Sequence, residues 1–214
     1  MKALLAKEFR LTMSPWFLLV FLPLGLLLIP MWVFPLAMAY VFVGVMIVVW
    51  RDRKDHDLEF LATLPMSFVA QAKARAWTIV LLELTYLVVG MALSVVRFFL
   101  YPVGNYASMN TNLAFFGITL IMYATFNLIF LPAYYSRPYR TWWPLGGGTL
   151  IALLVGLGLT TLVAVLPELS LLNDRGFGNL GPQLGVFAGG AVIFILLSWL
   201  ATNQAAKNIQ KTQL

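Results

Sequence analysis

The chain has no cysteine and a single histidine, His56, among its 214 residues. Disulfide bonds and thiolate metal sites are therefore excluded, and one histidine is too few for a typical histidine metal cluster. The phosphate-binding pattern Gly-x-x-x-x-Gly-Lys-Ser/Thr is also missing, because Gly146-Gly-Gly-Thr149 lacks the lysine. We therefore expect no metal, no cofactor and no catalytic residues. The chain is not expected to be an enzyme or to bind ATP by itself.

Charge is equally scarce, since only 10% of the residues are charged and 61% are hydrophobic, with a mean hydropathy of +0.88. Eight acidic and 14 basic residues cannot cover the surface of a soluble domain of this size. We interpret the chain as a multi-pass membrane protein with one domain, residues 1–214. The net charge of +6 does not indicate a nucleic-acid partner, because the bases flank apolar runs in groups of one to three.

Six apolar runs approach the length of about 17–25 residues that a membrane helix needs. They predict an all-α membrane protein with six transmembrane helices. A turn around Pro30–Pro35 would make the first two a tight hairpin. Residues 1–13 are predicted to form an amphipathic helix in the membrane interface, with an ordinary basic flank as the alternative. The six runs are Trp16–Met31, Phe34–Trp50, Trp77–Phe99, Leu113–Tyr135, Leu145–Leu166 and Leu184–Trp199.

The positions of the bases orient these spans. With both termini in the cytoplasm, 12 of the 14 bases lie inside, and only Arg97 and Arg175 lie outside. That bias fits the positive-inside rule. Six tryptophans fall at the predicted cytoplasmic ends, as an interfacial aromatic belt would: Trp16, Trp50, Trp77, Trp142, Trp143 and Trp199.

The loop between the second and third spans, residues 51–67, holds the largest group of charges, seven of them between Arg51 and Glu59. Asp55–Leu64 is predicted to form a short helix with Leu58 and Leu61 on one side and carboxylates on the other. Carboxylates near its start would suit the positive end of the helix dipole. The alternative is a charged loop that only fixes topology.

Two residues punctuate the end of this loop. Pro65 is expected to end the short helix, because the residue before a proline disfavours the α region. Ser67 is well placed to cap a new helix that begins at Phe68 and continues through the third span to Phe99. At 1.5 Å per residue such a helix would be roughly 48 Å long, and it would project beyond the hydrocarbon core.

The segment Leu61-Ala-Thr-Leu-Pro-Met-Ser67, followed by Ala70-Gln-Ala-Lys73 at the start of the third span, resembles the cytoplasmic loop of type-two ABC exporter permeases. These are the membrane subunits of ATP-binding-cassette transporters. The N-terminal Lys7-Glu-Phe-Arg10 is also similar to the amphipathic entry helix of that family. Thr63 stands where serine is commoner in the family.

The resemblance implies that Asp55–Leu64 is a coupling helix that docks on a separate ABC ATPase subunit. A second copy or a related permease would complete a dimer in the plasma membrane, in contact with membrane lipid. The small form without a large external domain implies a bacterial exporter of an amphipathic peptide, antibiotic or lipid-like substrate. The residues implied in the ATPase-coupling interface are Asp55, Asp57, Leu58, Glu59, Phe60, Leu61, Thr63, Leu64 and Pro65.

Two other functions stay open at this stage. One is the substrate-capture subunit of a vitamin or metal uptake system, which would need a concentrated polar site in the external loops 99–112 and 167–183. The other is a membrane immunity or scaffold protein that transports nothing. An ATPase that co-purifies with the chain would favour the exporter.

Glu83 is the one carboxylate inside a predicted span, about 9 Å beyond Trp77. Ionisable groups at such depth usually face a bundle interior or a wet cavity. Glu83 is therefore a candidate pathway residue. The alternatives are a structural hydrogen bond to Asn127 or Thr125, or a side chain that reaches back to the interface.

Small residues four apart predict close helix contacts in the last two spans. The fifth span has Gly148, Ala152 and Gly156, and the sixth has Gly185 and Gly189.

Overall fold

The computed structural model describes residues 15–54, 67–101, 104–105, 108–136, 142–175 and 179–212, and all regular secondary structure in these ranges is helical. Five helices are long and apolar enough to cross a membrane. In chain order the elements are η1 (Pro15–Leu28), α2 (Phe34–Ala39), α3 (Val41–Lys54), α5 (Phe68–Leu100), α6 (Leu113–Ser136), α7 (Trp142–Val165), η2 (Pro167–Leu172) and α8 (Leu180–Thr212).

The predicted all-α class is confirmed, and five of the six expected apolar runs form helices of spanning length. The first run forms η1, a 14-residue 3₁₀ helix that is shorter than the other five. A 3₁₀ helix rises about 2.0 Å per residue, so η1 covers more distance than an α-helix of the same length. The second run is interrupted at Tyr40, which separates α2 from α3.

The later spans begin and end close to the predicted residues, with one exception. α6 extends one residue past the expected Tyr135, and α5 contains the predicted third span. α8 is the exception, because it starts at Leu180 and continues to Thr212, well beyond the apolar run that ends at Trp199. With 33 residues each, α5 and α8 are roughly 50 Å long and exceed the roughly 30 Å of a hydrocarbon core.

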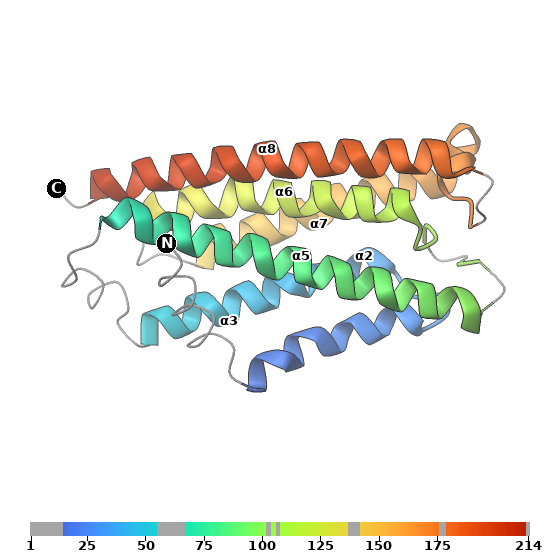
Figure 1. The fold of residues 1–214 in the computed structure, drawn as a ribbon, viewed down its shortest axis with the longest axis horizontal. Helices are drawn as coiled ribbons and strands as arrows, with labels where there is room; N and C mark the ends of the chain where they lie inside the picture. The colour runs from blue at the N-terminus through green and yellow to red at the C-terminus, as the bar shows by residue number, and fades with distance from the viewer. Residues whose placement is uncertain are drawn as a thin grey trace.

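The helices pack around α6 (Figure 1). α6 makes its most extensive contact with α8 and its second with α7. α5 crosses the bundle diagonally and packs on α8 and η1; η1 and α3 lie on the opposite side of α5 from α8, while α2 packs on η1 and α7. α6 is accordingly the most buried of the long helices, whereas only 28% and 22% of the most apolar stretches of α7 and α8 are buried.

The contact between α6 and α8 depends on two glycines. A Cβ at Gly117 would lie 2.6 Å from the Val186 carbonyl oxygen and 2.8 Å from Phe187 Cα. A Cβ at Gly190 would lie 2.9 Å from Gly117 Cα and 2.8 Å from its carbonyl carbon. All these atoms are backbone, so no side-chain rotation could make room. The two helices therefore touch backbone to backbone at this crossing.

The predicted small-residue contacts are correct for one span and wrong for the other. Gly148, Ala152 and Gly156 are buried. A Cβ added at Gly156 would lie only 2.7 Å from the Met122 Sδ of α6. Gly185 and Gly189, in contrast, have no atom within 4 Å of an added Cβ. The contact face of α8 lies one residue further along, at Gly190.

Arg97 fastens the C-terminal end of η1 to α5. Its Nη1 donates hydrogen bonds to the carbonyl oxygens of Leu27 at 3.1 Å and Ile29 at 3.2 Å. The guanidinium carbon lies 4.6 Å from the centre of the Phe34 ring, within cation–π distance. Carbonyls that a helix leaves unpaired at its last turn thus receive a charged donor. Arg97, predicted only as an external base, is a buried structural residue.

Asparagine side chains join the loops at this same end of the bundle. The Asn110 Nδ2 donates to the carbonyl of Asn173 at 2.8 Å, and the Asn112 Nδ2 donates to the carbonyls of Leu172 at 2.7 Å and Asp174 at 2.9 Å. The Asn105 Nδ2 likewise donates to the carbonyl of Trp32 at 3.0 Å. Backbone groups without a helical partner are satisfied in this way. The described loops at this end are consequently tied to one another.

Candidate functional site

The predicted coupling segment lies outside the described residues. This applies to the implied interface residues Asp55, Asp57, Leu58, Glu59, Phe60, Leu61, Thr63, Leu64 and Pro65, and also to the proposed interfacial helix 1–13. The structure does describe the two flanks of the segment. α3 ends at Lys54, and α5 starts at Phe68. Figure 1 shows both of these helix ends at the same end of the bundle.

The predicted N-cap at Ser67 is confirmed. Ser67 has an extended backbone, and its Oγ accepts a hydrogen bond from the Ala70 amide at 3.4 Å. A serine in this position satisfies one of the amide groups that the first turn of a helix leaves unpaired. The segment that resembles the exporter loop therefore leads directly into the capped start of a 33-residue helix.

Glu83 forms a buried polar cluster with residues of two other helices. It is 0% exposed, and its Oε2 accepts a hydrogen bond of 2.7 Å from the Asn127 Nδ2 of α6. The same Nδ2 group lies 3.2 Å from Ser198 Oγ of α8. Polar side chains therefore join α5, α6 and α8 at one depth of the bundle.

These contacts decide between the structural alternatives for Glu83. The predicted hydrogen bond to Asn127 is confirmed, whereas the Thr125 hydroxyl donates instead to the Ile121 carbonyl at 2.9 Å. The alternative that the Glu83 side chain reaches back to the interface is wrong, because no part of Glu83 is exposed. The reading of Glu83 as a pathway residue remains a prediction.

Two oxygens of this cluster have no hydrogen-bond donor among the described residues, Glu83 Oε1 and Asn127 Oδ1. An ionised carboxylate that is buried without a cation is costly in apolar surroundings. A protonated Glu83 would bring its own donor. A carboxylic acid and a primary amide can exchange two hydrogen bonds, N–H to O and O–H to O. One proton would then satisfy both oxygens.

Two tyrosines add hydrogen bonds to the same region. The Tyr86 hydroxyl donates to the Ala37 carbonyl at 3.1 Å, and the Tyr123 hydroxyl donates to the Met38 carbonyl at 3.0 Å. Both carbonyls belong to α2, close to the interruption at Tyr40. The break between α2 and α3 is therefore held by α5 and α6. Sequence reasoning missed both tyrosines, because an aromatic residue in an apolar run carries no signal of its distant partner.

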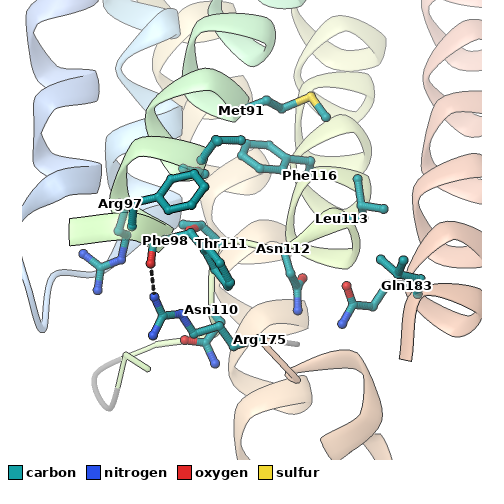
Figure 2. Close-up of a pocket in the computed structure, with 14 residues that line it drawn as sticks. Met91, Arg97, Phe98, Asn110, Thr111, Asn112, Leu113, Phe116, Arg175 and Gln183 are labelled. Atoms are coloured by element: carbon teal, nitrogen blue, oxygen red, sulfur yellow. Dashed lines mark hydrogen bonds between the residues drawn. The ribbon is translucent and has the colours of Figure 1, made fainter. Parts of the chain in front are cut away.

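A cavity of about 360 Å³ lies at the end of the bundle opposite Lys54 and Thr212. It is lined by the last turns of α5, the first turns of α6 and α8, and loop residues that include Arg175. Figure 2 shows apolar residues, such as Met91 and Phe116, at one end of the cavity and Asn110 and Arg175 at the other. No function was predicted for this place.

This fold defines an α-helical protein whose five long apolar helices are those of a multi-pass membrane protein. No protein-family model, curated protein or solved structure matches the chain. The function must therefore be argued from its own residues.

Proposed function

We propose that the chain is the membrane permease subunit of an ATP-driven ABC exporter, with ATP hydrolysed by a separate subunit. One observation carries the proposal. A segment that resembles the coupling loop of type-two exporter permeases, Leu61–Lys73, leads through a serine-capped start into a helix of 33 residues. Such a helix is long enough to carry its first turns beyond the hydrocarbon core, where an aqueous partner can be reached.

In this proposal η1 is the first of six spans, and both termini are cytoplasmic. The bases support the orientation: α3, α5 and α8 place Arg51, Lys73 and Lys211 at one end of the bundle, while Arg97 and Arg175 lie at the other. Five described tryptophans of the predicted belt support membrane insertion, because each is exposed by 49% or more: Trp50, Trp77, Trp142, Trp143 and Trp199.

The coupling itself would be mechanical. Two permease units, identical or related, would form the pathway, and an ATPase subunit would dock on Asp55–Leu64 of each. Leu58, Phe60 and Leu61 would enter an apolar groove of the ATPase, while Asp57 and Glu59 would meet basic groups around it. ATP binding would move this helix and, through it, α3 and α5. The cargo class expected is an amphipathic peptide, antibiotic or lipid-like molecule.

The orientation can be tested by labelling, because the chain contains no cysteine. A membrane-impermeant maleimide should label Leu171→Cys in intact cells, since Leu171 is 52% exposed in η2 at the proposed external end. Lys211→Cys should be labelled only after the membrane is opened. The cysteine-free parent gives the background. Labelling of Lys211→Cys in intact cells would contradict the proposed orientation.

The ATPase partner can be tested by co-purification. An ATPase should co-purify with the tagged chain, and Leu61→Asp should remove at least about nine-tenths of it, because a buried charge in a docking groove costs several kcal/mol. The matched control is Leu171→Asp, which places the same charge at the opposite end. Both variants should insert into the membrane in wild-type amounts. If Leu61→Asp retains the ATPase and transports normally, the proposal is wrong.

A further inference from the structure

The cavity beside Arg175 exists because α5 diverges from α8 toward the C-terminal end of α5. Figure 1 shows the two helices close together near the start of α5 and well apart at its end. α6 only partly fills the space, since α5 makes far less contact with α6 than with α8. The remaining cavity of about 360 Å³ is of a size that small-molecule sites have in proteins.

The walls of the cavity change character along its length. Met91 lies nine residues before the end of α5, roughly 14 Å deeper than Leu100. Around it the lining is mainly apolar, from Met91, Val95 and Phe116, and the Ser94 hydroxyl there donates to the Gly90 carbonyl of its own helix at 2.9 Å. Toward the loops the lining becomes polar, with Thr111 and Arg175. A ligand that fits both parts must be amphiphilic.

Arg175 is the positive charge at the polar end. Its Nη2 donates to the Phe98 carbonyl at 2.6 Å, and its guanidinium carbon lies 4.8 Å from the centre of the Phe98 ring. One of its five N–H donors is engaged in this way, and the described partner is neutral. The neighbouring carboxylate, Asp174, accepts a hydrogen bond from Asn179 at 2.9 Å.

The backbone beside Arg175 is held firmly. The Asp174 carbonyl accepts hydrogen bonds from Asn112, the residue before α6, at 2.9 Å and from Gln183 of α8 at 2.8 Å. Arg97 also lines the cavity, but Figure 2 shows its guanidinium directed away from Arg175, toward η1, where it binds the Leu27 and Ile29 carbonyls. Arg175 is therefore the positioned cation that a ligand in the cavity would meet. A guanidinium is well suited to carboxylate or phosphate groups.

The cavity also reaches the outer surface of the bundle. Val95 and Phe99 on α5 line it and are 58% and 79% exposed, and Leu180 on α8 lines it and is 40% exposed. An acyl chain could therefore enter sideways between α5 and α8, with no need to pass through the loops.

We propose that this cavity binds an anionic amphiphile, with its phosphate or carboxylate head on Arg175 and its hydrocarbon chain along Val95, Met91 and Phe116. The ligand is either an anionic lipid that stays with the protein or an amphiphile that exchanges. The site does not rest on the proposed exporter function: failure of ligand binding would leave ATPase co-purification unaffected, and the reverse also holds.

Native mass spectrometry of the purified full chain tests the site. Phosphatidylglycerol should bind about tenfold more tightly than phosphatidylcholine with the same acyl chains, since a charge-assisted hydrogen bond contributes roughly this factor. Arg175→Gln should abolish this preference. The control Lys211→Gln, at the other end of the bundle, should keep it. Phosphatidylglycerol carried over from the cells would identify a resident lipid, and binding only on titration would identify an exchanging ligand.

Two outcomes would overturn the proposal. One is an unchanged preference in Arg175→Gln, which would place the anion elsewhere. The other is displacement of phosphatidylglycerol by inorganic phosphate alone, which would show that the hydrocarbon chain contributes nothing. If Arg175→Gln fails to fold, the wild-type protein still decides, because equal binding of the two lipids would exclude an anion-selective site.

Discussion

Gly190→Leu should strongly destabilise the protein. Its side chain would need the space that the backbone of Gly117 occupies, and Gly117 cannot move without separating α6 from α8. Overpacking of an adaptable core costs about 1–3 kcal/mol, and a backbone obstacle should bring the cost to the upper end or beyond. We expect a melting temperature in detergent that is lower by roughly 5–10 °C or a failure to accumulate. Thermal scans with fluorescence-detected gel filtration would measure it.

The neighbouring glycine supplies the control. Gly189→Leu introduces the same side chain one residue earlier, where no atom lies within 4 Å of the added Cβ. Its melting temperature should equal or slightly exceed that of the wild type, because leucine favours a helix more than glycine does. Equal losses in the two variants would mean that the close contact at Gly117 does not hold the bundle together.

Glu83→Leu should also destabilise the protein, whereas Glu83→Gln should not. Leucine leaves Asn127 buried without its carboxyl partner, and an unsatisfied buried polar group costs about 1–3 kcal/mol. Glutamine can accept from Asn127 Nδ2 and donate to Asn127 Oδ1, which mimics a protonated glutamate. We expect Glu83→Leu to lower the melting temperature by roughly 3–10 °C and Glu83→Gln to stay within about 2 °C of the wild type.

Glu168 provides the comparison for this series, because it is an exposed glutamate in η2. Glu168→Leu should change the melting temperature little. A large loss in Glu83→Gln would show that the carboxylate is ionised and has a cation that glutamine cannot bind. Transport separates structure from pathway: if Glu83→Gln keeps both the rate and the choice of substrate, Glu83 is structural only.

Hydropathy was sufficient to locate the long helices, because length and apolar content are properties of each segment alone. The Ser67 cap could be predicted for the same reason, since its partner is three residues away. The extension of α8 to Thr212 could not be predicted from hydropathy, because the polar residues after Trp199 form a helix without an apolar run. The 3₁₀ form of η1 was likewise invisible to a pattern that counts only apolar residues.

Contacts between helices were much harder to predict. Gly185, Gly189 and Gly190 are all small, and sequence spacing favoured the first two, but only the packing of α6 determines that Gly190 faces it. The roles of Arg97 and Arg175 were missed because their hydrogen-bond partners, the Leu27 and Phe98 carbonyls, are backbone groups far away in the sequence. Glu83 was found because a carboxylate inside an apolar run is unusual whatever its partner.

The glycine crossing has a consequence for motion. Two helices that touch through their main chains cannot slide without a clash, so α6 and α8 should move as one rigid body, with α7 attached through Gly156. α5 has little contact with α6 and joins this body mainly through α8, while it also packs on η1. Displacements of α5 should therefore be largest toward its C-terminal end, where it separates from α8. Residues 55–66 connect α3 to α5, so a push on that segment would reach α5 at the end where it lies close to α8.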